Sequence, residues 1–268
     1  MITNSQWLLE NLDNPNLIII DCRFRLSDPA WGYQQYLLSH LPQAYYLDLD
    51  LDLSGKLATH GGRHPLPDAA VFTEKLNKIG VNSASIIVAY DDNRFAFAAR
   101  LWWLLRYFGH QQVMVLDGGF SAWVSSGYPV TSDIPLPKQG NFSPIPQLEK
   151  IATREELITS ENTPEIVLID SRASDRYLGK REPLDPVAGH IPGAINFPWL
   201  DVSTSEGYFL SSADQEQIWQ KLPPHDSIIV YCGSGVTACV NLLSLDSLGI
   251  TNTKLYLGGW SDWCSYLI

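Results

Sequence analysis

Short apolar runs alternate with segments of helical periodicity along the whole chain of 268 residues. The runs are rich in Ile, Val and Leu, residues that favour buried strands. They predict strands at residues 17–21, 45–49, 86–90 and 113–116 in the first half, and at 166–170, 194–197, 228–231 and 254–257 in the second. The segment FAFAARLWWLLRYFG, residues 95–109, is predicted to be a helix. This alternation predicts an α/β fold with parallel sheets flanked by helices.

The pattern occurs twice. LIIIDCR at residues 17–23 matches VLIDSR at 167–172, and LDGGFSAW at 116–123 matches YLGGWSDW at 256–263. Because the matching segments occur in the same order, the chain is predicted to contain a duplicated domain.

A segment with prolines, a glycine and no periodicity, IPLPKQGNFSPIPQ, separates the two copies and is typical of a linker. We therefore predict a first domain at residues 1–134, a linker at 135–147 and a second domain at 148–268.

The predicted strand at 228–231 leads directly into the segment CGSGVT, residues 232–237, and a helical pattern follows. Glycines at 233 and 235 allow successive backbone N–H groups to form an anion-binding nest at a helix N-terminus. A thiol at Cys232 is expected to be a thiolate near neutral pH in such a nest. The other cysteines lack one, and we interpret them as structural: Cys22, Cys239 and Cys264.

The equivalent strand of the first half ends differently. Alignment of SIIV at residues 85–88 with SIIV at 227–230 places Tyr90 or Asp91 opposite Cys232. Acidic residues replace the glycines there, and we expect the loop Asp91-Asp92-Asn93 to cradle an anion poorly. The first domain is therefore predicted to be catalytically silent.

The first half also carries a longer loop. His40 and Ser85 are 45 residues apart, whereas the matching His190 and Ser227 are 37 apart. The additional residues fall around LSGKLATHGGRHPLP, residues 53–67. A glycine-rich insertion with two histidines and an arginine predicts a functional or interfacial role.

Composition narrows the possible partners. The formal net charge is −11 and no Lys/Arg cluster occurs, so no nucleic-acid partner is expected. No apolar run reaches membrane-spanning length, and the N-terminus lacks the pattern of a signal peptide. Four cysteines without a C-x-x-C pair indicate reduced thiols and a cytoplasmic location. The six histidines are not spaced as metal ligands with the cysteines, so neither a metal nor an organic cofactor is expected.

Together the motifs resemble the two-domain rhodanese-type sulfurtransferases, the 3-mercaptopyruvate/thiosulfate sulfurtransferase family. The resemblance covers nearly the whole chain and rests on CGSGVTA at 232–238, GHIPGAINFPW at 189–199, DSRASDRYLG at 170–179, GGRHPLP at 61–67 and RLWWLLRYFGH at 100–110. It implies tandem rhodanese-like domains, with an active cysteine only in the C-terminal one.

The resemblance implies that Cys232 takes a sulfane sulfur from a small donor, 3-mercaptopyruvate or thiosulfate, and carries it as a persulfide. A thiophilic acceptor such as cyanide or a thiol then removes the sulfur. The residues implied to bind the anionic substrate through the loop are Gly233, Ser234, Gly235, Val236 and Thr237. These small molecules are the expected partners, and a monomer is expected.

The resemblance leaves the donor open. CGSGVT resembles the loop of mercaptopyruvate-type enzymes, which also place two substrate-binding arginines before the GHIPG motif. Arg176 matches the first arginine, but Leu184 and Asp185 stand where the second is expected, and Arg181 lies a few residues earlier.

Mercaptopyruvate-type enzymes also imply a Ser–His–Asp relay beside the cysteine. Ser234, His64 and Asp50 occupy the matching positions. By contrast, Asp170 and Arg172 recur as Asp21 and Arg23 in the half without the cysteine. This repetition favours a structural role for both pairs, and the same holds for the repeated His40 and His190.

Two other functions remain open. A cysteine-dependent phosphatase of similar fold requires an arginine in the loop, and none occurs before Leu243. A persulfide carrier or regulatory module without turnover would use Cys232 and the same loop.

Overall fold

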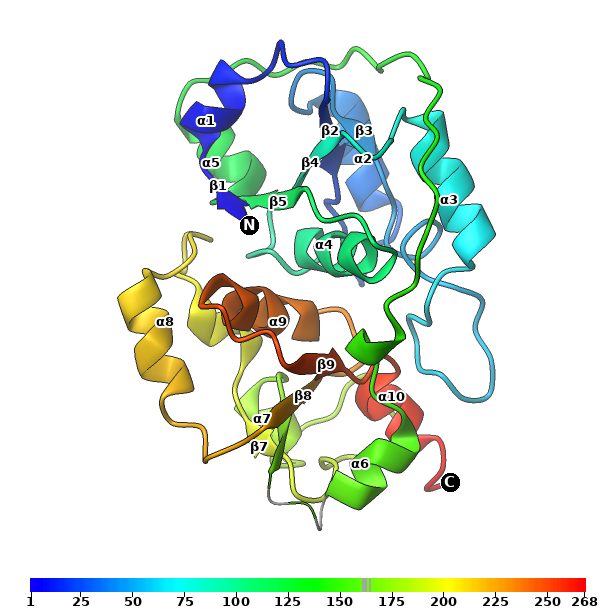
Figure 1. The fold of residues 1–268 in the computed structure, drawn as a ribbon, viewed down its shortest axis with the longest axis vertical. Helices are drawn as coiled ribbons and strands as arrows, with labels where there is room; N and C mark the ends of the chain where they lie inside the picture. The colour runs from blue at the N-terminus through cyan, green and yellow to red at the C-terminus, as the bar shows by residue number, and fades with distance from the viewer. Residues whose placement is uncertain (161–162, 164) are drawn as a thin grey trace. The chain divides into compact units, whose positions relative to one another are not determined.

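The computed structural model describes residues 1–160, 163 and 165–268, which form two compact units (Figure 1). Unit 1 contains residues 1–55, 67–147 and 205–209, and unit 2 contains 56–66, 148–204 and 210–268. Residues 56–66 therefore pack with the second half of the chain, and residues 205–209 pack with the first. No helix in the described part of the chain is long and apolar enough to cross a bilayer.

Unit 1 is built on a parallel sheet with the strand order β1-β5-β4-β2-β3. The strands are β1 (Ile2–Thr3), β2 (Leu17–Asp21), β3 (Tyr45–Tyr46), β4 (Ile86–Tyr90) and β5 (Val113–Leu116). The helices are α1 (Ser5–Glu10), α2 (Trp31–Leu38), α3 (Ala69–Lys78), α4 (Ala98–Tyr107) and α5 (Gly119–Ser125).

Unit 2 repeats this plan with the strand order β7-β6-β8-β9, again all parallel. The strands are β6 (Ile166–Asp170), β7 (Ile195–Asn196), β8 (Ser227–Tyr231) and β9 (Thr253–Leu255). The helices are α6 (Arg154–Ser160), α7 (Ser174–Tyr177), α8 (Ser212–Trp219), α9 (Ala238–Ser247) and α10 (Gly259–Cys264), with short 3₁₀ turns η1 (Leu148–Lys150) and η2 (Trp199–Val202). The predicted α/β class is confirmed.

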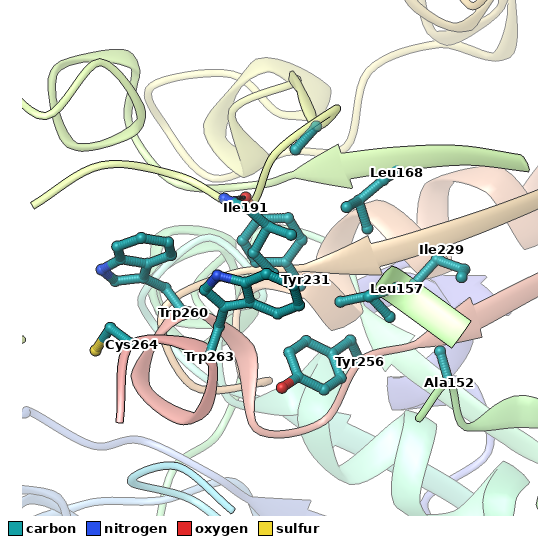
Figure 2. Packing of buried hydrophobic residues seen from close by; sticks show 11 residues of the cluster. Ala152, Leu157, Leu168, Ile191, Ile229, Tyr231, Tyr256, Trp260, Trp263 and Cys264 are labelled. Carbon is teal, nitrogen blue, oxygen red and sulfur yellow. Dashed lines mark hydrogen bonds between the residues drawn. The ribbon is translucent and has the colours of Figure 1, made fainter. Parts of the chain in front are cut away.

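The core of unit 2 fixes the strand end that carries Cys232. Figure 2 shows Tyr231, Tyr256, Trp260 and Trp263 gathered near the ends of the strands, beside aliphatic residues from the sheet. Tyr231 is fully buried and Trp260 is 2% exposed. Burying a large apolar side chain stabilises a fold by about 2–3 kcal/mol. The burial of Tyr231 and Trp260 therefore stabilises the end of β8 and helix α10, between which the Cys232 loop lies.

The two Asp–Arg pairs are the same in both units. Arg23 Nη2 lies 2.6 Å from Asp21 Oδ2, and Arg172 Nη2 lies 2.6 Å from Asp170 Oδ2. All four residues are buried. Because unit 1 has this pair without a cysteine at the end of β4, the geometry supports the predicted structural role.

The repeated histidines also have matching contacts. His40 Nδ1 lies 2.7 Å from the carbonyl oxygen of Tyr36, and His190 Nδ1 lies 2.8 Å from that of Tyr177. Each imidazole stacks on the same tyrosine, with ring centroids 4.1 and 4.0 Å apart. These contacts join a helix to the following loop in each unit, in agreement with a structural role.

Candidate active site

Cys232 lies at the carboxyl end of β8, in the loop that leads to α9. The side chain is buried, with 2% of the residue exposed. Its carbonyl oxygen accepts a hydrogen bond from the N–H of Trp260 at 2.8 Å, and that of Gly233 accepts one from Ser261 at 2.9 Å. The loop is thus attached through its backbone to the start of α10.

Two glycines allow this close attachment. Gly235 has φ +74°, and a methyl group built on it would lie 2.1 Å from the carbonyl oxygen of Leu257. Gly259 has φ +61°, and a methyl group there would lie 2.5 Å from the carbonyl oxygen of Cys232. Any other side chain at either position would strain the backbone and push the loops apart.

The loop retains unused hydrogen-bond donors. Within the described residues, no protein acceptor is recorded for the backbone N–H groups of Gly233, Ser234, Val236 and Thr237. Thr237 is also the N-cap residue of α9, where the helix dipole favours negative charge. The loop is therefore suited to stabilise a thiolate, a persulfide or an anionic ligand.

A second segment of unit 2 brings His64 to this loop. His64 Nδ1 lies 2.7 Å from Ser234 Oγ, and both residues are buried. The predicted contact between His64 and Ser234 is thus present in the structure. Asp50, the third predicted member of the relay, belongs to unit 1, where its N–H donates to Asp48 Oδ1 at 2.8 Å. Burial and the neighbouring Asp48 raise the pKa of Asp50.

The segment 56–66 is anchored to the end of the chain by several contacts. The N–H of Gly61 donates to Asp262 Oδ1 at 2.6 Å. His60 stacks on Tyr266 with centroids 3.9 Å apart, and its Nδ1 lies 2.7 Å from Ser265 Oγ. Gly62, at φ +78°, approaches the backbone of Gly258 so closely that a methyl group would lie 2.3 Å from its oxygen. These contacts fix the position of the two residues that follow Gly62.

The first of those residues is Arg63, and its guanidinium lies beside the residue that follows Cys232. A methyl group built on Gly233 would lie 3.0 Å from Arg63 Nη2 and 3.4 Å from Arg176 Nη1. Two cations therefore converge on the loop. We predicted Arg176 as a substrate-binding residue, but missed Arg63, although it stands next to His64 in the GGRHPLP motif.

Two buried carboxylates hold these arginines. Arg63 pairs with Asp185, and Arg176 pairs with Glu182 at 2.6 Å and with Asp185 at 3.3 Å. The side chains of Asp185 and Glu182 are 2% and 3% exposed. Burial raises the pKa of Asp185, although Arg63 opposes this rise. Burial, the largest single effect, acts in the same direction on Glu182. The hydrogen bond and charge of Arg176, together with the backbone N–H groups of Leu184 and Asp185, outweigh it and leave the pKa of Glu182 lowered.

Arg181, the alternative second arginine, does not join the cluster. Its Nε lies 2.6 Å from Asp175 Oδ2, and both side chains are largely solvent-exposed. Leu184 is exposed, and its N–H donates to Glu182 Oε1 at 3.1 Å. The position where a second arginine was expected therefore carries the carboxylate of Asp185, and the cation opposite it comes from residue 63.

The loop after β4 in unit 1 surrounds a carboxylate that belongs to the loop itself. Asp91 corresponds to Cys232, because its carbonyl oxygen accepts from the N–H of Phe120 at 2.9 Å, as that of Cys232 does from Trp260. The Asp91 carboxylate accepts four backbone N–H bonds of 2.8 to 3.1 Å, from Asn93, Phe95, Phe97 and Ala98. The loop thus surrounds its own carboxylate and these donors are occupied, so the expectation that it cradles an anionic ligand poorly stays a prediction.

Comparisons with known proteins agree with this geometry. The family "Rhodanese-like domain" matches residues 4–126 and 153–266. A "Probable 3-mercaptopyruvate sulfurtransferase" of Pseudomonas aeruginosa is 40% identical over 267 residues, covering 98% of this chain and 94% of that protein. A "Thiosulfate sulfurtransferase" of Mus musculus is 30% identical, covering 98% and 91%. The crystal structure of SseA from Escherichia coli, described as a 3-mercaptopyruvate sulfotransferase, has a TM-score of 0.85 at 32% identity and covers 97% of this chain and 98% of its own.

The chain belongs to the rhodanese family, and the expected tandem arrangement of rhodanese-like domains is confirmed. Within that family it is an enzyme of the sulfurtransferase class.

Proposed function

We propose that this sulfurtransferase carries sulfur as a persulfide on Cys232, from a small anionic donor to a thiophilic acceptor. The observation that supports this best is the placement of Cys232 at the carboxyl end of β8, beside four backbone N–H groups without a recorded protein acceptor. A thiolate and a persulfide are both anionic, so the same donors stabilise the enzyme before and after it is loaded.

With 3-mercaptopyruvate, the Cys232 thiolate attacks the sulfur of the donor thiol. The S–S bond forms as the C–S bond breaks, and the electron pair goes to carbon to give the enolate of pyruvate. The enolate takes up a proton and the new persulfide loses one, which leaves pyruvate and an ionised persulfide. We assign this proton transfer to Ser234 and His64, which lie 2.7 Å apart.

With thiosulfate, the thiolate attacks the outer sulfur and the S–S bond of the donor breaks. Sulfite leaves with the electron pair, and no proton is needed. In the second half-reaction, cyanide attacks the outer sulfur of the persulfide, giving thiocyanate and the free thiolate. A thiol acceptor leaves with the sulfur as its own persulfide.

We place 3-mercaptopyruvate ahead of thiosulfate as the donor. The loop 233–237 contains no basic residue, and the Ser234–His64 pair supplies a proton that only the carbon leaving group requires. The 40% identical relative is named for 3-mercaptopyruvate as well. A carrier without turnover would use the same cysteine, so turnover is the quantity to measure.

The test is thiocyanate formation from each donor with cyanide, measured for the wild-type protein and for Cys232→Ser. We expect turnover with 3-mercaptopyruvate above that with thiosulfate, and a loss of at least about 1,000-fold in Cys232→Ser. Activity that survives in Cys232→Ser would rule out the persulfide on this residue. Stoichiometric sulfur loading without turnover would instead identify a carrier.

The proposed relay of Ser234, His64 and Asp50 is tested separately. His64→Ala is expected to lower kcat with 3-mercaptopyruvate by about 10- to 100-fold and to leave turnover of thiosulfate nearly unchanged, because sulfite departs without a proton. Asp50→Asn should show the same donor-selective loss if Asp50 is the third member. His60→Ala, in the same loop, is the matched control. An equal loss in His60→Ala, or a loss of His64→Ala with both donors, would assign these effects to loop placement.

A further inference from the structure

The carboxylate of Asp262 joins two parts of unit 2 that are far apart in the sequence. Its Oδ1 accepts a hydrogen bond from the N–H of Gly61 at 2.6 Å, and its Oδ2 accepts one from the hydroxyl of Tyr256. The residue is 7% exposed, and burying a carboxylate is costly unless its oxygens are hydrogen-bonded. Both oxygens have such a donor, so this buried group connects the segment 56–66 to the residue that follows β9.

Tyr256 gives this carboxylate a fixed support. It belongs to the buried core cluster of unit 2 drawn in Figure 2, and its N–H donates to the carbonyl oxygen of Val230 at 2.9 Å. Burial, followed by the hydrogen bond and the charge of Asp262, raises the pKa of Tyr256, so the phenol stays protonated and donates. The position of Asp262 is therefore tied to β8, the strand that leads to Cys232.

The turn at Gly258 brings the segment 56–66 and the cysteine loop onto one base. A methyl group built on Gly258 would lie 2.3 Å from Cβ of Asp262, and one built on Gly62 would lie 2.3 Å from the carbonyl oxygen of Gly258. The Asp262 side chain and the segment thus both pack on this turn. Helix α10, which begins at the next residue, also holds the backbone of the Cys232 loop.

Side-chain contacts place the segment, because it lacks regular backbone pairing. Residues 56–66 contain no helix or strand, and among the described residues no backbone–backbone hydrogen bond is recorded for residues 56–62. The position of these residues therefore depends on hydrogen bonds such as the one from Gly61 to Asp262. His64 follows three residues after Gly61, with its Nδ1 2.7 Å from Ser234 Oγ. A displacement of Gly61 would be passed on to this pair.

We propose that Asp262 is a positioning residue of the sulfurtransferase, which holds His64 in place by fixing Gly61. The inference rests on the proposed function, in which Ser234 and His64 move the proton that the carbon leaving group of 3-mercaptopyruvate requires. A shift of about 1 Å in a catalytic group can lower a rate by about 100-fold. An anchor that acts only through His64 therefore controls the rate of the step in which this proton moves.

The test compares kcat for the two donors in Asp262→Ala. With 3-mercaptopyruvate, kcat is expected to fall by about tenfold, because the segment that carries His64 loses a charge-assisted hydrogen bond. With thiosulfate, kcat should change by less than about twofold, because sulfite leaves without a proton. Asp262→Asn keeps an oxygen acceptor for the N–H of Gly61 and should restore most of the loss. An equal loss with both donors would overturn the proposal.

Leu157→Val is the control for a general loss of stability. Leu157 belongs to the same core cluster as Tyr256 and is 1% exposed, so this shortening leaves a small cavity in that core. We expect it to lower the midpoint of unfolding in urea and to leave the ratio of the two kcat values unchanged. If Leu157→Val changed this ratio as much as Asp262→Ala, the effect of Asp262 would be one of stability, and the proposal would be wrong.

A double-mutant cycle tests whether Asp262 acts through His64. In the His64→Ala background, the further change Asp262→Ala should alter kcat with 3-mercaptopyruvate by less than about twofold, because the group that Asp262 positions is already gone. Losses that multiply as if the two residues were independent would contradict this route.

Hydrogen exchange of the Gly61 amide, measured by NMR, gives a readout that does not require sulfur transfer. Asp262→Ala should speed this exchange by about tenfold or more, since the N–H loses its acceptor, and Asp262→Asn should speed it less. Failure of the wild-type protein to turn over either donor would refute the proposed function, whereas the exchange rates would still show whether Asp262 anchors the segment. Unchanged exchange in Asp262→Ala would overturn the anchor itself.

Discussion

The loops after β4 and β8 occupy the same place in two copies of one fold, yet they treat negative charge in opposite ways. In unit 1 the Asp91 carboxylate accepts four backbone N–H bonds, so the donors of the loop are occupied by a residue of the loop itself. In unit 2 a cysteine stands at that position, and four N–H groups have no recorded acceptor among the described residues. Asp91 thus occupies donors of its own loop, whereas Cys232 does not occupy those of the loop in unit 2.

The two loops also differ in the residues that form their turns. Both loops turn by left-handed residues, but unit 1 uses Arg94 and Phe95, at φ +52° and +72°, where unit 2 uses Gly235. Non-glycine residues in this conformation carry strain, which the buried hydrogen bonds to Asp91 offset. Unit 2 uses a glycine there and needs no such compensation.

The largest effect is expected when the aspartate of the unit 1 loop is copied into the loop of unit 2. Cys232→Asp should abolish turnover, with a loss of at least about 1,000-fold, because the nucleophile is gone and its carboxylate occupies the N–H donors. Its free energy of unfolding in urea should exceed that of Cys232→Ser, because only the aspartate satisfies several buried donors. A Cys232→Asp protein that is less stable than Cys232→Ser would show that the two loops are not equivalent nests.

The next prediction removes the carboxylate of Asp91 from the loop after β4. Asp91→Ala leaves three buried N–H groups and one partly buried N–H group without their acceptor, and should lower the free energy of unfolding by about 3 kcal/mol. Equilibrium unfolding in urea measures this loss, and Asp92→Ala, which removes an exposed acidic residue next to it, is the control. An effect of Asp91→Ala no larger than that of the control would mean that the carboxylate does not stabilise the loop.

The smallest expected effect is a pH dependence. Burial raises the pKa of Asp91, and the four N–H bonds oppose this rise without cancelling it. A carboxyl group whose pKa is higher in the folded state stabilises the fold most below its unfolded pKa, and this contribution is lost as the pH rises through the folded value. The stability of the wild-type protein relative to Asp91→Asn should therefore decrease from about pH 3 to pH 7. A relative stability that increases over this range would contradict the raised pKa.

The sequence predicted the parts of the fold that depend on local pattern. Buried β-branched runs gave the bounds of β2, β4, β5 and β6 as the structure has them. β3 and β7 are shorter than predicted because only two residues of each run pair with a neighbour, and β1 is too short to show any periodicity. Helix α4 begins at Ala98 and not at Phe95, since Phe95 is left-handed.

The sequence predicted those parts of the site that form a local motif or match a known family. Cys232 and the glycines form a contiguous motif, and His64 was found only through the family resemblance. Arg63 was missed because it is held by an ion pair with a partner 122 residues away, and no local pattern indicates that Asp185 stands opposite it. The acidic residues of the loop at Asp91 did not indicate that its backbone N–H groups converge on a single carboxylate, because that depends on the backbone conformation.

The two compact units do not coincide with the two halves of the chain. Residues 56–66 of the first copy pack with unit 2, and residues 205–209 of the second pack with unit 1. A cut in the connecting segment 135–147 would leave the half that carries Cys232 without Arg63 and His64. Each half of the chain therefore supplies a short segment to the other unit, and neither half alone contains all the residues of its unit.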